Sequence, residues 1–217
     1  MAFLVALSVA ATPGERLLYD VKYGPLKLGT MSLEVLEPDC SAGETLEHFR
    51  CDLEFTRSLS WLFWAQYRLE SWSRGPAMLT ARSYKRTREP NYRAEWTATY
   101  GRDSVRYSDG KSFAVPDSSR DMLTMWYFLR TVPLAPGDSF RAVVHADRRT
   151  SSLRVAVRGP KRVRTSAGVF DCLALTPDAG SPLGTVWLSN DESRIPVVIR
   201  TRIGGVAISA QLRQVER

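Results

Sequence analysis

Residues 92–100 read Tyr-Arg-Ala-Glu-Trp-Thr-Ala-Thr-Tyr, so aromatic or small residues alternate with charged or hydroxyl-bearing ones. A period of two is typical of a β-strand with one dry face and one wet face. Similar alternation, separated by turn-forming residues, occupies residues 17–23, 31–35, 140–145, 195–203 and 206–212. The pattern predicts an all-β fold of about a dozen sequentially paired strands, forming a strongly curved antiparallel meander sheet or an incomplete β-barrel.

One segment departs from this period and predicts a single helix over residues 120–131. Asp117-Ser118-Ser119 can cap its start, and Pro133 stops it. The segment is apolar over most of its circumference, with helical spacing at Met122, Met125, Trp126 and Leu129. Such a helix needs burial on several sides, so we expect it on or in the concave face of the sheet.

The composition suits one domain with a proper core, because 44% of the 217 residues are hydrophobic. We assign residues 12–217 to this single β domain. The net charge of +7 comes mostly from arginine, and acidic residues are interleaved with the basic ones. This arrangement favours a solvated basic exterior, with peripheral contact to an anionic membrane as the second interpretation. No nucleic-acid partner is expected.

The first residues differ from the rest of the chain. Residues 2–11 read AFLVALSVAA, an uncharged apolar run that is too short to span a bilayer. Ser8-Val9-Ala10 resembles a cleavage site, so residues 1–11 are interpreted as a truncated signal peptide. A buried first strand is the alternative. The signal interpretation predicts a protein that is periplasmic or otherwise exported, and soluble after signal removal.

Three cysteines are present, and export would place them where disulfides persist. Cys40 and Cys51 flank a polar stretch of ten residues, and a bridge between them is one hypothesis. Cys172 is interpreted as a small buried apolar group.

Five blocks along the chain resemble one bacterial family, the domain of unknown function 3108. Their order and spacing carry the resemblance: Gly14–Tyr19 with Tyr23-Gly24 and Gly29; Tyr127–Arg130; Pro133-Leu134 with Pro136-Gly137-Asp138; Ala167–Cys172; and Val186–Ser189 leading to Arg194–Val197. The resemblance implies an exported protein without an assigned activity, and it transfers no catalytic residue. A more distant architectural likeness is to periplasmic lipoprotein carriers, which fold a curved sheet over an apolar cavity.

No motif for a metal, a cofactor, a phosphate loop or a serine hydrolase occurs, so we expect no metal, no cofactor and no catalytic residues. His145 and Asp147 lie two residues apart on one predicted strand, where they could be a base and its orienting acid. An ordinary surface pair is the simpler interpretation, because nothing supplies a nucleophile.

The leading hypothesis is a non-enzymatic exported protein that binds an apolar or lipidic ligand, or holds an envelope component. The Trp-rich stretch 59–64 is either a loop over the core or the mouth of a cavity. The expected cavity residues are Trp61, Phe63, Trp64, Met122, Met125, Trp126 and Leu129. The alternatives are a structural or protein-interaction module with a filled core and, more weakly, an uncharacterised enzyme. A cavity of roughly 300–1,000 Å³ would distinguish ligand binding from a filled core.

Overall fold

The structure is a computed structural model that describes residues 11–40, 43–55, 64–178, 181, 183–203 and 205–217. The segment interpreted as a signal peptide therefore lies outside the described residues except for Ala11, which is partly buried against the core. Trp61 and Phe63 also lie outside them.

Fifteen strands of the described chain form one sheet, and one helix accompanies it. The strands are β1 (Arg16–Tyr23), β2 (Leu26–Asp39), β3 (Leu46–Phe55), β4 (Gln66–Arg74), β5 (Leu79–Glu89), β6 (Tyr92–Tyr100), β7 (Ser104–Tyr107), β8 (Ser112–Ala114), β9 (Ser119–Arg120), β10 (Ser139–Ala146), β11 (Arg149–Thr165), β12 (Gly168–Pro177), β13 (Thr185–Ser189), β14 (Pro196–Ile203) and β15 (Val206–Glu216). The helix is α1 (Met122–Thr131).

The predicted all-β class, the single helix and the largely antiparallel sheet are confirmed. The predicted strand number was too low. Twelve strands have five or more residues, and β7, β8 and β9 have only four, three and two. Strands this short carry too little alternation to be recognised from sequence.

The strand order runs from β8 through β1 to β15 and back to β9, so the terminal strands β1 and β15 pair in the middle of the sheet. All neighbours are antiparallel except β9 and β10, which are parallel. The sheet is not closed into a barrel, because β8 and β9 are its two edge strands.

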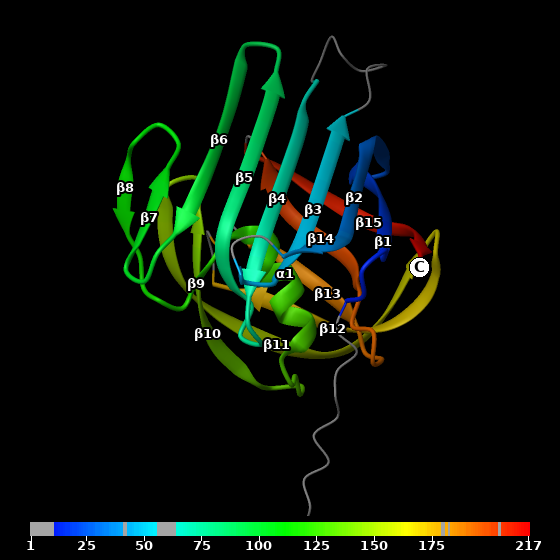
Figure 1. Cartoon of the computed structure of the whole chain (residues 1–217). Coiled ribbons are helices and arrows are strands. Elements are labelled where there is room, and N and C mark those ends of the chain that lie inside the picture. Colours follow the sequence, from blue (N-terminus) through cyan, green and yellow to red (C-terminus); the bar gives the residue numbers. More distant parts are fainter. Residues whose placement is uncertain (1–10, 41–42, 56–63, 179–180, 182, 204) are drawn as a thin grey trace, which may run out of the picture.

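Both halves of the sheet contact α1, which packs against β3 and β4 on one side and β10 on the other. In Figure 1, β3–β6 cross in front of β11–β14, and α1 is visible near the lower ends of β3 and β4. Seven of its ten residues are buried, so the helix forms part of the core, as its apolar circumference requires.

The start of α1 differs from the sequence prediction. Ser119 and Arg120 pair with β10 as β9, so the helix begins at Met122. Asp121 is its N-cap, because its carboxylate accepts hydrogen bonds from the backbone N–H groups of Leu123 and Thr124. The serine-rich segment before it therefore leads into a strand pairing and does not cap the helix.

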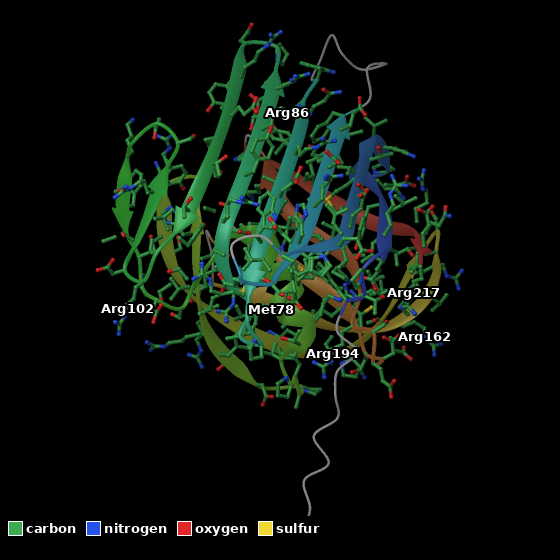
Figure 2. All side chains as sticks on the ribbon, in the orientation of Figure 1. Met78, Arg86, Arg102, Arg162, Arg194 and Arg217 are labelled. Atoms are coloured by element: carbon green, nitrogen blue, oxygen red, sulfur yellow. The ribbon has the colours of Figure 1, made fainter. Side chains whose placement is uncertain are left out.

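The basic residues interleaved along the chain lie largely at its surface. Figure 2 shows the labelled arginines Arg102, Arg162 and Arg217 at the periphery of the molecule. Several surface cations pair with carboxylates on neighbouring strands, such as Arg16 with Glu34 at 2.9 Å. Such exposed pairs each contribute little to stability, typically below about 1 kcal/mol.

Candidate functional site

A cavity of about 1030 Å³ lies between the first turn of α1, the middle of β4–β6 and the adjoining ends of β10 and β12–β15. Apolar groups from several elements line it: Leu69, Trp96, Met122, Leu123, Ala146 and Ile208. Four basic and four acidic side chains line it as well: Lys22, Lys85, Arg200, Arg202, Glu70, Asp121, Asp147 and Asp178. Hydroxyl groups, among them those of Ser71 and Ser83, complete the polar lining. The cavity is therefore amphipathic.

The cap residue Asp121 borders the cavity where β4, β5 and α1 meet. Its Oδ1 accepts a hydrogen bond from Ser71 Oγ at 2.9 Å, and its backbone N–H donates to Thr80 Oγ1 at 2.9 Å. Burial raises the pKa of Asp121, and the hydrogen bonds to its carboxylate oppose that rise. The acceptor capacity of this carboxylate is used to join the helix to β4, which marks it as a structural group.

An ion pair between Lys85 on β5 and Asp147 lines one side of the cavity. Asp147 and Arg148 form the β10–β11 turn and have φ values of 47° and 65°. A two-residue hairpin turn of type I′ requires positive φ at both positions. Directly across the strands, Lys85 lies between Leu69 of β4 and Trp96 of β6, so its ammonium stands in a partly apolar wall.

His145 is buried at the end of β10, beside the cavity. Its Nε2 lies 2.9 Å from the Tyr107 hydroxyl and its Nδ1 lies 2.9 Å from Thr150 Oγ1. Tyr100 and Phe113 also approach the ring. Burial lowers the pKa of His145, so the neutral imidazole is favoured.

The structure therefore separates the two residues that the sequence offered as a base and its acid. Both ring nitrogens of His145 face hydroxyl groups, whereas Asp147 pairs with Lys85. In this arrangement His145 joins β7 to β10 and β11, which lie far apart in the strand order. Its contacts are those of a clamp between two parts of the sheet.

The backbone is tightly fitted where β13 begins beside β14. Gly184 has a φ of +68°, and a Cβ there would lie 2.1 Å from the carbonyl oxygen of Arg200. Only glycine fits this position. The close approach fixes β14 at the level of Arg200, which lines the cavity.

The sequence-predicted cavity residues have three different locations. Met122 lines the cavity, whereas Met125, Trp126 and Leu129 are buried in the core cluster around α1. Trp64 is partly buried just before β4, and Trp61 and Phe63 lie outside the described residues. Sequence reasoning missed Lys85, Asp121 and Arg200, because each is unremarkable in its own segment and only the strand register brings them to one cavity.

The predicted disulfide between Cys40 and Cys51 is contradicted. Both thiols are free, and Cys51 is buried on β3 opposite Leu33 of β2. Leu33 precedes Cys40 by seven residues, which corresponds to roughly 20 Å along a strand. A bridge needs Cα atoms about 4.4–6.8 Å apart. The ten-residue spacing suggested a loop, but half of it belongs to β3. Burial raises the pKa of the Cys51 thiol well above its usual range.

Two features are absent from the described residues. No group of three or more His, Cys, Asp or Glu side chains there is arranged to hold a metal ion. No helix in that part of the chain is long and apolar enough to cross a membrane.

Comparison with known proteins identifies a family but not an activity. The family model described as "Protein of unknown function (DUF3108)" matches residues 18–210. No curated protein matches the chain.

Among solved structures, a β-barrel-like protein of the domain of unknown function DUF1849 from Brucella abortus is similar, with a TM-score of 0.63 and 11% identity. That alignment covers 95% of this chain and 98% of the other, and at this identity it concerns the fold alone. A DUF1089 family protein from Pseudomonas aeruginosa aligns with a TM-score of 0.38 and 14% identity, over 95% of this chain and 97% of that one. So low a score supports no argument.

Proposed function

We propose that this chain, which belongs to the DUF3108 family of proteins of unknown function, is a non-enzymatic exported protein that binds an amphipathic, lipidic ligand. Membership of this family supplies no activity, so the proposal is made from the cavity. The observation that carries the proposal is the cavity of about 1030 Å³ with a mixed apolar and charged lining. Ligand sites commonly occupy about 300–1,000 Å³, whereas an interaction module with a filled core needs no such space.

The lining argues for an amphipathic ligand over a purely apolar one. Leu69, Trp96 and Met122 offer apolar surface, where an alkyl chain gains about 25 cal/mol for each Å² removed from water. Carboxylates line the cavity too, but Lys22 donates to the neutral Gln211 side chain and Arg200 lies over the Trp187 ring, so their positive charge suits an anionic headgroup. A ligand without a polar group would leave these cations facing apolar atoms, at a cost in desolvation.

The place of action in the proposal is the bacterial envelope. It rests on the apolar run of residues 2–11 and its small-residue cleavage site. A lipidic ligand fits this setting, because molecules with long alkyl chains need a protein cavity to leave a membrane for water.

The proposal is tested by native mass spectrometry of protein purified from a bacterial envelope, followed by organic extraction and analysis of bound molecules. We expect a mass excess that disappears on extraction and corresponds to an anionic amphiphile. Recovery of the protein without any bound molecule, together with no binding of cis-parinaric acid (a fluorescent fatty acid), would contradict the proposal.

A matched pair of variants locates the binding. Ala146→Phe adds a phenyl group to the cavity wall and is expected to weaken cis-parinaric acid binding at least about tenfold, by occupying ligand space. Thr99→Phe adds a phenyl group to an exposed position of β6 and should leave binding unchanged. Thermal unfolding of both variants shows whether each is folded. Equal binding by the two folded variants would place the ligand elsewhere.

A further inference from the structure

A row of basic and hydroxyl-bearing side chains crosses five neighbouring strands at the edge of the cavity. The pairing register aligns Thr185 of β13, Arg200 of β14, Ser209 of β15, Lys22 of β1 and Lys27 of β2. Residues directly opposite each other share a face of the sheet at Cβ distances of about 4.5–5.5 Å. Arg202, two residues beyond Arg200 on the same face, extends this cationic row, which we define as Lys22, Lys27, Arg200 and Arg202.

The cationic row carries more positive charge than its neighbours neutralise. Lys27 pairs with Asp20 at 2.6 Å, and Lys22 donates to the neutral Gln211 side chain at 3.0 Å. Arg200 lies over the Trp187 ring at 4.7 Å. Within the described residues, neither Arg200 nor Arg202 has a carboxylate within ion-pair distance. Lys22 stands directly opposite Lys27, and like charges so placed are destabilising, so the row favours an external anion.

Exposed apolar side chains flank this cationic row. Tyr23, Leu26 and Val206 are 55%, 48% and 47% exposed, and they are three of the six large hydrophobic residues most exposed in the described chain. Tyr23 ends β1 and Leu26 begins β2, while Val206 begins β15. Since β1 and β15 are antiparallel neighbours, the C-terminal end of β1 and the N-terminal end of β15 lie at the same end of these central strands.

We propose that the β1–β2 and β14–β15 hairpin tips, with the cationic row, dock on the surface of an anionic lipid bilayer and present the cavity to it. The charge complementarity is with lipid phosphates, each cation near such a surface contributing about 1 kcal/mol. Tyrosine and aliphatic tips beside lysine and arginine suit the wet–dry boundary of a membrane. The cavity is continuous with the docking surface, because Lys22, Gly24, Arg200 and Arg202 line it. This inference deepens the proposed function by naming where the ligand would enter or leave.

Vesicle sedimentation tests the docking surface with the full chain. We expect binding to vesicles of phosphatidylglycerol and phosphatidylcholine, weakened by salt, and much weaker binding to phosphatidylcholine alone. Arg200→Ser/Arg202→Ser should weaken binding about 30-fold. Arg158→Ser/Arg164→Ser removes the same charge from exposed positions of β11 and should weaken it less than about threefold. Equal losses in the two variants would assign the attraction to the net charge and overturn the proposal.

The apolar tips are tested separately from the cavity. Tyr23→Ser/Leu26→Ser should weaken vesicle binding while leaving cis-parinaric acid binding unchanged, since neither residue lines the cavity. Unchanged vesicle binding by this variant would overturn the docking surface. Absence of wild-type binding to anionic vesicles would also overturn it, and would leave an acidic protein as the alternative occupant. Neither outcome touches the cavity proposal, which is tested by native mass spectrometry and by the fatty-acid probe.

Discussion

The two ends of α1 lie in different surroundings, although both belong to one ten-residue helix. Near its C-terminal end, Arg130 forms a two-pronged ion pair with Glu15 at 2.5 and 3.0 Å, and Tyr127 stacks on Phe49 at 4.0 Å. Near its N-terminal end, Asp121 and Met122 border the cavity. We call the C-terminal end of α1 the sealed end, because it holds the two halves of the sheet together. We call the N-terminal end the open end, because it leaves room for a ligand.

The sealed end is expected to give the largest effect on stability. Arg130→Met removes the partner of the buried Glu15 carboxylate and also the hydrogen bonds to the carbonyl oxygen of Ser193. Breaking a buried pair on one side typically costs about 3–5 kcal/mol. Urea unfolding measures the change. The double variant Glu15→Gln/Arg130→Met should be more stable than Arg130→Met, because no uncompensated charge remains. If Arg130→Met were as stable as the wild type, the C-terminal end of α1 would not be sealed by this ion pair.

At the open, N-terminal end, Asp121→Ala should have a moderate effect on stability. The variant removes the helix cap, whose loss costs about 0.5–2 kcal/mol, and leaves the Ser71 hydroxyl without its acceptor. The same urea titration provides the measurement. Ser119→Ala, two residues earlier and also buried, is the control and should change stability less. If Ser119→Ala lost more stability than Asp121→Ala, the helix would be capped by the serine-rich segment, as the sequence predicted.

The difference between the two ends of α1 also shows what the spacing of apolar residues along the sequence can and cannot predict. Period-two patterns and helical spacing depend on local burial, so the strands and the helix around Trp126 were predictable. Pairing of β1 with β15 joins residues nearly the whole chain apart, and no local pattern encodes it. The cavity and the cationic row depend on that pairing, because Lys22 and Arg200 become neighbours only through Ser209. Apolar spacing therefore found Met122 but could not distinguish it from Met125.

His145 offers a pH-dependent test of how the sheet is held beside the open end. Burial places the pKa of its imidazole below the usual 6.5, so between these two values the unfolded chain binds more protons than the folded protein. Stability should be full above about pH 6.5 and fall as the pH drops below it. Thermal unfolding at pH 7.5 and 5.5 measures the loss. His145→Asn should reduce this pH dependence.

His48 is the matched control for that pH dependence. Burial lowers its pKa too, but Glu70 at 3.0 Å opposes the shift by favouring the charged imidazole. His48→Asn should therefore remove less of the pH dependence than His145→Asn does. If the two variants behaved in the reverse order, the clamp between β7 and β10 would not be the pH-sensitive contact.

The smallest stability change is expected for Met122→Ala, and its comparison with Met125→Ala sharpens the difference between the two ends. Met125 is fully buried, so Met125→Ala should cost about 2–5 kcal/mol by leaving a void in the core. Met122 already borders open space, so its truncation enlarges an existing cavity and should cost clearly less. Binding of cis-parinaric acid should respond in the opposite order, changing for Met122→Ala and not for a folded Met125→Ala protein. Equal stability losses with unchanged probe binding would show that the N-terminal turn of α1 is as closed as the rest of the helix, and the cavity would lose its helical wall.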